Sequence, residues 1–274
     1  MKRRIQNMAS IECNNKDLVQ LNQSNGISRI LLNDTSRKNA LSKNMLQCLI
    51  ATLEKLKDDD KQKVIVIRGA GNVFCSGADL QWMKQGLLQT DEENRQDAAL
   101  FYMLFDLLNS FPKPVIVWVE KFAIGGALGL LACADHVIAD STVKLTFSEV
   151  KLGLIPATIA PFVVNKIGIS QARSLMLSAE TFSAKKARRL GLVHEVLPAR
   201  AIPERVDELC RLFKANSSQA MASTKHLLNK LEAKTNDTDI KELCLSKIAE
   251  SRKSDEGQEG VKAFFEKRRP QWYK

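Results

Sequence analysis

The sequence has few aromatic residues and no cysteine pattern typical of a metal or redox centre. Aromatic side chains make up 6% of its 274 residues, so its core must be built from Leu, Ile, Val and Ala, which is typical of an α/β protein. Its six cysteines form no CxxC pair and no Cys/His cluster with metal-ligand spacing. We therefore expect no metal site, and reduced thiols in a cytoplasmic protein.

Long apolar segments are also missing. The longest apolar stretches, such as 124–134, are too short to cross a bilayer, and the basic start lacks the apolar run of a secretory signal. We therefore expect no membrane partner. There is no internal repeat and no low-complexity linker. Apolar residues nevertheless make up 45% of the chain, which is enough for a sizeable core.

The charge balance is basic, with 41 Lys and Arg against 31 Asp and Glu, or +10. Such a surface attracts polyanions, among them nucleic acid, anionic membranes and phosphorylated cofactors. A solvated basic surface without a specific partner is the competing explanation. Composition alone does not choose between them.

The residue pattern predicts strands that alternate with helices over the first two thirds of the chain. Strands are expected at 17–22, 27–33, 64–67, 115–119 and 137–139, and helices at 42–56 and 91–109. Strands that are connected through helices in this way form a mostly parallel sheet. The remainder is expected to be helical, at 202–214, 218–231, 240–251 and 255–268. We divide the chain into an α/β core, 1–200, and a helical region, 201–274.

Two glycine-containing turns each follow a predicted buried strand. The first, 74–80, contains Gly77-Ala78-Asp79, and the second, 123–135, contains Gly125-Gly126. Each opens a helix, where backbone N–H groups have no partner. An ordinary strand–turn–helix is the plain explanation of either turn alone. Together, N–H groups that converge on one oxygen would form an oxyanion hole.

One carboxylate, Glu149, occurs in the mostly apolar segment 145–156. A carboxylate in a dry site has a raised pKa, which suits a general acid or base. The alternative is a surface Glu paired with Lys144 or Lys151.

Segments 74–80, 123–135 and 147–156 resemble the signature blocks of the enoyl-CoA hydratase/isomerase (crotonase) superfamily. Segment 37–42 resembles its coenzyme-A loop and 259–268 its C-terminal helix. The resemblance implies an α/β fold, the crotonase-type ββα spiral core with a C-terminal helical region that forms homotrimers or homohexamers. It implies an acyl-CoA substrate, with coenzyme A as part of that substrate and no other cofactor.

The resemblance also implies roles for individual residues. Thioester-binding N–H groups would be those of Ala78 and Gly126, and Glu149 would be the acid or base. Its coenzyme-A binding residues would be Lys38, Ala40, Ala78, Asp79, Leu80, Gly125, Gly126, Phe264 and Lys267. The last two would close the phosphate end of the ligand, either in the same chain or from a neighbouring subunit.

The sequence departs from the family pattern at two positions. Gly129 stands where two-glutamate hydratases have their first Glu, and Glu120 precedes the second turn, where it is either a displaced acid or a salt-bridged surface residue. A single Glu also resembles some isomerases, whereas the segment around Glu149 resembles methylglutaconyl-CoA hydratases of leucine breakdown. We therefore predict a hydratase of short branched enoyl-CoA, with an isomerase, an RNA-binding protein or a degenerate scaffold as alternatives.

Overall fold

A computed structural model describes residues 13, 15, 17–232 and 237–273 of the protein. A six-stranded sheet forms its centre, in the order β1-β2-β3-β4-β6-β9. β1 and β2 pair antiparallel and the remaining neighbours pair parallel, which confirms the mostly parallel sheet. These strands are Val19–Ser24, Ile27–Leu32, Val64–Gly69, Val115–Val119, His136–Asp140 and Glu195–Leu197.

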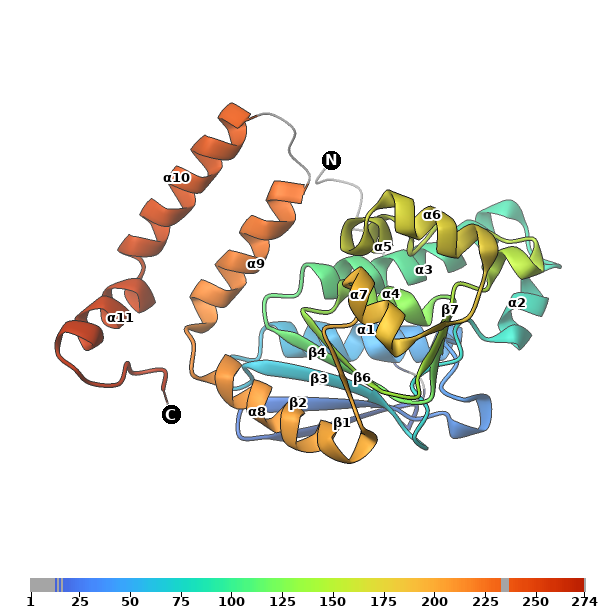
Figure 1. Cartoon of the computed structure of the whole chain (residues 1–274), viewed down its shortest axis with the longest axis horizontal. Coiled ribbons are helices and arrows are strands. Elements are labelled where there is room, and N and C mark those ends of the chain that lie inside the picture. The colour runs from blue at the N-terminus through green and yellow to red at the C-terminus, as the bar shows by residue number, and fades with distance from the viewer. Residues whose placement is uncertain (1–12, 14, 16, 233–236, 274) are drawn as a thin grey trace.

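Helices cover both faces of this sheet (Figure 1). On one face lie α1 (Lys43–Lys57), α3 (Asp91–Asn109) and α4 (Ala127–Cys133), within the larger apolar core. On the other face, α8 (Ile202–Lys214) packs Ile202, Val206 and Leu209 against strand side chains such as Val66. α8 thus completes the core, although it lies in the all-helical part of the sequence.

A second, three-stranded sheet lies beside the first and helps to build the site. Its order is β5-β7-β8, with β5 at Phe122–Ile124, β7 at Lys144–Thr146 and β8 at Phe182–Ser183. Around it lie α5 (Ala160–Ile167), α6 (Ile169–Ser178) and α7 (Ala184–Leu190). These short elements carry little periodicity, and sequence reasoning had not located them.

The C-terminal helices α9 (Ser218–Glu232), α10 (Asp237–Lys253) and α11 (Asp255–Phe265) extend from the body (Figure 1). Lys225 on α9 joins them to the core through Asp135, at 2.7 Å between Nζ and Oδ2. Asn229 donates to the carbonyl of Asn109 at 2.9 Å. Together with α8, these elements match the four predicted C-terminal helices closely.

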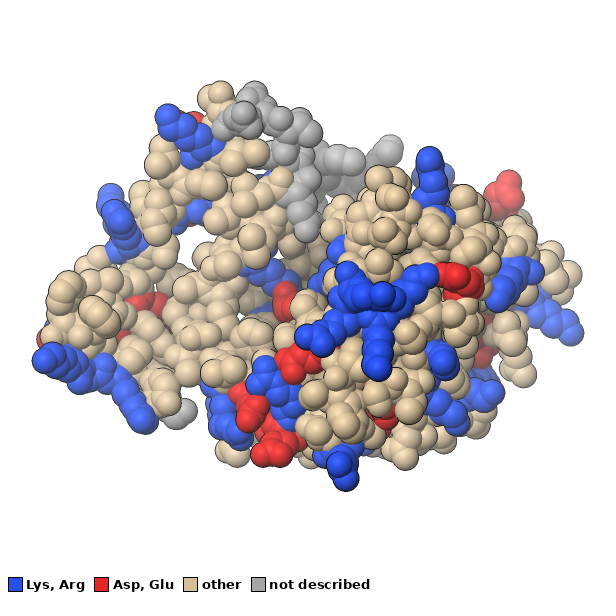
Figure 2. Space-filling model, in the orientation of Figure 1, with Lys and Arg blue, Asp and Glu red and all other residues tan. Residues whose placement is uncertain are grey.

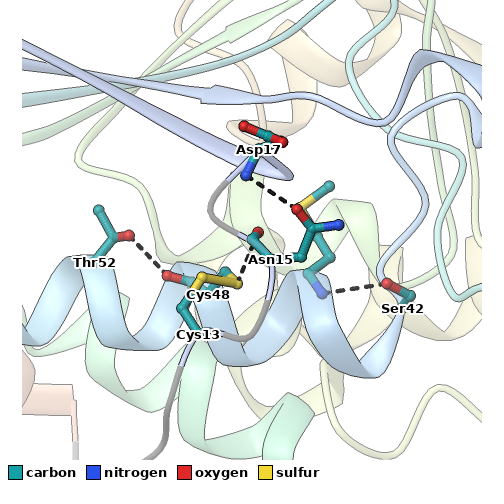
Figure 3. Close-up of a disulfide and its surroundings, with 7 residues drawn as sticks. Cys13, Asn15, Asp17, Ser42, Cys48 and Thr52 are labelled. Carbon is teal, nitrogen blue, oxygen red and sulfur yellow. Dashed lines mark hydrogen bonds between the residues drawn. A yellow bond between two sulfur atoms is a disulfide. The ribbon is translucent and has the colours of Figure 1, made fainter.

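One expectation about cysteine is wrong. Cys13 and Cys48 form a disulfide, which ties the segment before β1 to the buried side of α1 (Figure 3). Sequence spacing gave no sign of it because the two cysteines become neighbours only when this segment packs on α1. The other described cysteines, at 75, 133, 210 and 244, are free thiols.

The basic surplus is visible at the surface. Figure 2 shows Lys and Arg gathered in the middle of the face in view, where Figure 1 places α7. α7 carries Lys185, Lys186, Arg188 and Arg189. Within the described part of the chain, no helix is long and apolar enough to cross a membrane.

Candidate active site

The first glycine turn follows β3 and leads into α2 (Leu80–Gly86). Gly77 has a φ of +89°, and a Cβ there would lie 2.4 Å from the carbonyl oxygen of Ile124. A side chain at Gly77 would therefore push the first turn away from the second one. Glycine permits both the positive φ and this close approach. The paired backbones of Cys75 and Ala123 continue the contact.

The second turn lies between β5 and α4, and it holds the residues expected from the sequence. Gly125, with a φ of +52°, donates to the carbonyl of Thr146 at 2.8 Å, and Gly126 caps α4. Every residue of α4 is buried, so the helix that follows the turn is held firmly in the core and fixes the position of the turn. Both turns thus meet at one place although they come from separate parts of the chain.

The two backbone N–H groups predicted to form the oxyanion hole are available to a ligand. Leu41 pairs with the backbone beside Ala78, but through the Gly77 carbonyl and the Asp79 N–H. Neither Ala78 N–H nor Gly126 N–H donates to a protein acceptor in the described part of the chain. Both residues line the same cavity, together with Glu149. This arrangement suits a site that stabilises a developing oxyanion.

Glu149 lies next to these donors. A Cβ on Gly125 would lie 3.1 Å from Glu149 Oε1, so the carboxylate rests directly against the second turn. Its Oε2 is buried and has no hydrogen-bond partner, and among the described residues Glu149 forms no ion pair. The pairing with Lys144 or Lys151 is therefore wrong. Burial raises the pKa of the Glu149 carboxyl, against a smaller opposing effect of backbone N–H groups.

A cavity of about 500 Å³ extends from Glu149 towards the loop at 36–40. Lys38, Ala40, Ala78, Asp79, Leu80, Gly125 and Gly126 all line it, as the sequence predicts for coenzyme-A binding. Asn39, fully buried, holds the loop by donating to the carbonyls of Ala70 and Val73 at 3.0 and 2.7 Å. Sequence reasoning had not assigned Arg37, which lines the cavity and lies 3.3 Å from Asp79.

A second, more apolar cavity of about 660 Å³ continues from Ala78, Gly126 and Glu149 to the other side. Its walls come from α2, α3 and the segment 152–158, and include Trp82, Phe101 and Ile155. After the roles that the family resemblance implies for their lining residues, we call the two cavities the coenzyme-A cavity and the acyl cavity. Because they share the two donors and Glu149, a thioester placed there would have one substituent in each.

Two predicted coenzyme-A residues do not reach this groove in a single chain. Phe264 lies on α11 and Lys267 just beyond it, and neither lines the coenzyme-A or the acyl cavity. Figure 1 places α11 at the far end of the molecule from α2. The Phe264 side chain is 78% exposed. Any contribution of these residues to binding must therefore come from another copy of the chain.

The space at Gly129, where the family pattern has its first Glu, is filled by neighbouring side chains. A Cβ on Gly129 would lie 2.6 Å from both Ile159 Cγ2 and Phe105 Cε1, closer than real Cβ contacts allow. No side chain fits there without repacking. Glu120 does not replace it, because it does not line either cavity; burial raises the pKa of its carboxyl. Its expected salt bridge is also missing, since Glu120 has no ion pair among the described residues.

The groove brings two free backbone N–H groups and one buried carboxylate together, an arrangement that suits chemistry on an acyl thioester. Comparison with known proteins identifies the family. The model of the enoyl-CoA hydratase/isomerase family matches residues 22–274. Human mitochondrial methylglutaconyl-CoA hydratase is 30% identical over 258 residues, which cover 91% of this chain and 74% of that protein.

Solved structures give the same result. An enoyl-CoA hydratase from Shewanella pealeana superposes with a TM-score of 0.88 at 38% identity, over 94% of this chain and 96% of that one. An enoyl-CoA hydratase/isomerase from Marinobacter aquaeolei superposes with a TM-score of 0.89 at 30% identity, over 94% and 99%. The chain belongs to the enoyl-CoA hydratase/isomerase family, and the predicted crotonase fold is confirmed.

Proposed function

We propose that the protein hydrates a short branched 2-enoyl-CoA of the methylglutaconyl type, with Glu149 as both acid and base. One observation carries the proposal: a buried carboxylate oxygen without a partner shares a cavity with two free backbone N–H groups. A charge that is buried and unpaired is costly, and such groups are concentrated at active sites.

The reaction follows from this geometry. The N–H groups of Ala78 and Gly126 bind the thioester oxygen, where negative charge gathers as the double bond is attacked. Glu149 takes a proton from water, whose hydroxyl adds to C3, and returns a proton to C2. The carboxylate thus ends as it began, and one glutamate suffices. Each oxyanion donor contributes about 2.7–4 kcal/mol of transition-state stabilisation in enzymes of this kind.

An isomerase uses the same parts differently. There Glu149 would move a proton from C2 of a 3-enoyl-CoA to C4, without adding water. A panel of crotonyl-CoA, 3-methylcrotonyl-CoA, 3-methylglutaconyl-CoA and 3-hexenoyl-CoA separates the two. The proposal predicts loss of conjugated thioester absorbance and a product heavier by one water. A double-bond shift with no water gained would instead identify an isomerase, and no turnover at all a degenerate scaffold.

Glu149→Gln is the matching variant, with Glu204→Gln on the exposed part of α8 as its control. The amide keeps the shape of the side chain but cannot act as a base. We expect Glu149→Gln to lose about 10²–10⁴-fold in kcat and Glu204→Gln to lose nothing measurable. Equal rates in the two variants would exclude Glu149 from the chemistry.

Lys84 supports an acyl group that ends in a carboxylate, as methylglutaconyl does. Among the described residues it is the one cationic side chain that lines the acyl cavity. Lys84→Met should raise KM for 3-methylglutaconyl-CoA more than for crotonyl-CoA. An equal effect on both would favour an uncharged branched acyl group.

The proposal extends to homotrimers or homohexamers. Large apolar side chains are exposed on α10 and α11, namely Leu245, Ile248, Val261, Phe264 and Phe265. Such a surface in a second copy would also bring Phe264 and Lys267 towards a neighbouring coenzyme-A cavity. Sedimentation of the wild type and of Phe264→Ser tests this part.

RNA binding remains the alternative use of the basic α7 surface, and a titration in increasing salt distinguishes specific binding from general attraction.

A further inference from the structure

α2 forms a wall of both cavities but is attached to the rest of the protein at few points. Leu80 and Met83 line both cavities, and Lys84 and Gly86 line the acyl cavity. Trp82 is the one buried side chain of this helix. Leu80 itself is 72% exposed. The position of the acyl-cavity wall therefore depends mainly on how Trp82 is held.

Trp82 is held by a stacked ring and a hydrogen bond. Its ring centroid lies 5.4 Å from that of Phe101, with an interplanar angle of 13°. Its indole N–H donates to Asp97 Oδ2 at 2.8 Å. Asp97 and Phe101 both lie on α3, so both interactions fasten α2 to the same helix.

Asp97 connects four separate parts of the chain. Besides Trp82, it accepts from Lys43 on α1 at 2.9 Å and from Gln89, in the turn before α3, at 3.1 Å. Burial alone would raise the pKa of Asp97, but these three donors together lower it, so the carboxylate stays ionised at neutral pH. A charged acceptor makes stronger hydrogen bonds than a neutral one.

The same carboxylate fixes the orientation of the Gln89 amide. Because Gln89 Nε2 donates to Asp97, its Oε1 must point elsewhere, and there it is buried with no partner. Gln89 lines the acyl cavity. Asp97 thus determines the position of the Trp82 ring in the wall of the acyl cavity. It also determines the orientation of the Gln89 amide beside that ring.

We infer that Asp97 is a positioning residue for acyl selectivity, which acts by holding Trp82 and the α2 wall against α3. It lines the acyl cavity at the edge where Trp82 and Gln89 meet it, and it does not line the coenzyme-A cavity. Its effect falls on the shape of the acyl cavity. Without it, the Trp82 side chain keeps only the ring stack, while the last residue of α2 still accepts from Asn94 on α3 at 3.2 Å. The cavity then discriminates less between short branched and long straight chains. This inference rests on the proposed function, because it assigns the cavity to an acyl group.

Binding of unreactive thioesters tests the inference without relying on turnover. Calorimetry with isovaleryl-CoA and decanoyl-CoA gives a ratio of dissociation constants for each protein. In Asp97→Ala, the ratio should change about tenfold relative to the wild type, so that decanoyl-CoA binds relatively more tightly. Tenfold is the scale of discrimination that the shape of an apolar pocket supplies. Trp82→Phe, which keeps a ring but removes the N–H donor, should change it in the same direction.

Two further variants separate positioning from general stability. Lys43→Met removes the partner of Asp97 on the α1 side and leaves the indole bond in place, so it should keep the wild-type ratio. Asp97→Asn retains an acceptor for the indole and should restore most of the selectivity lost in Asp97→Ala. Thermal unfolding of all variants measures their stability separately.

The inference is overturned if Asp97→Ala lowers stability and leaves the ratio unchanged, or if Lys43→Met changes the ratio as much. Should Asp97→Ala not fold, an unchanged ratio in Trp82→Phe overturns it equally. If the wild type binds both thioesters but hydrates no enoyl-CoA, the proposed function fails while the selectivity result still stands. If it binds neither thioester, both fail.

Discussion

Gly129→Glu would place a carboxylate where two-glutamate hydratases have their first one, and we expect it to damage the protein rather than improve it. The new Cβ would lie 2.6 Å from both Phe105 Cε1 and Ile159 Cγ2. Overpacking of this kind costs about 1–3 kcal/mol, and an unpaired buried carboxylate costs several more. Replacing a helical glycine returns about 1 kcal/mol. We therefore expect a net loss of about 3 kcal/mol or more in the free energy of unfolding.

Urea unfolding and the hydration assay measure the two consequences. Gly129→Ala isolates the steric part and should lose about 0–2 kcal/mol, because helix propensity offsets some of the overpacking. Gly129→Glu combined with Phe105→Ala makes room, and the double variant should lose less stability than the sum of the two single variants. A Gly129→Glu protein as stable as the wild type, with faster hydration, would refute the reasoning: it would mean that the position is open to the substrate.

Three other predictions concern stability and pH. Cys13→Ser opens a loop that spans 35 positions and should cost about 4 kcal/mol of unfolding free energy; reductant should weaken the wild type equally and leave the variant unchanged. Burial, with nearby Lys166 and His136, lowers the pKa of His194 to about 4. Stability should therefore be complete above pH 6.5 and fall progressively towards pH 4 as the unfolded chain takes up the proton, a dependence that His194→Gln should reduce. Burial raises the pKa of Glu149, and the base must be ionised to act. As the pH is lowered, kcat/KM should therefore begin to fall above the pH range in which an ordinary glutamate titrates. A fall confined to that ordinary range or below would contradict the role of Glu149 as the base.

The main elements of the fold could be predicted because their apolar residues repeat with clear periods. The segment 64–67 is continuously apolar, and β3 is buried on both faces there. α1 begins after Ser42, whose side chain accepts from the backbone of Met45. The small sheet β5-β7-β8 escaped prediction because strands of two or three residues have no measurable period. Nothing in the local sequence predicted that α8 covers a sheet face.

The site was predictable where backbone geometry defines it. Gly77 and Gly125 signal unusual backbone angles, and the structure brings their turns together. Side-chain contacts over long sequence distances were not predictable. The bond between Lys43 and Asp97 joins separate helices, and the Cys13–Cys48 disulfide joins a terminal segment to α1. Such contacts depend on how whole elements pack, which residue types alone do not specify.

Glu149 is the residue on which the proposed reaction depends most directly, and one comparison tests its role. Hydration of a short 2-enoyl-CoA by the wild type and by Glu149→Gln is measured together with the affinity of each for isovaleryl-CoA. We predict that the variant binds the saturated thioester normally through the backbone donors at Ala78 and Gly126, but hydrates the enoyl-CoA about 10²–10⁴-fold more slowly. Hydration at the wild-type rate by a variant that binds normally would contradict the central claim.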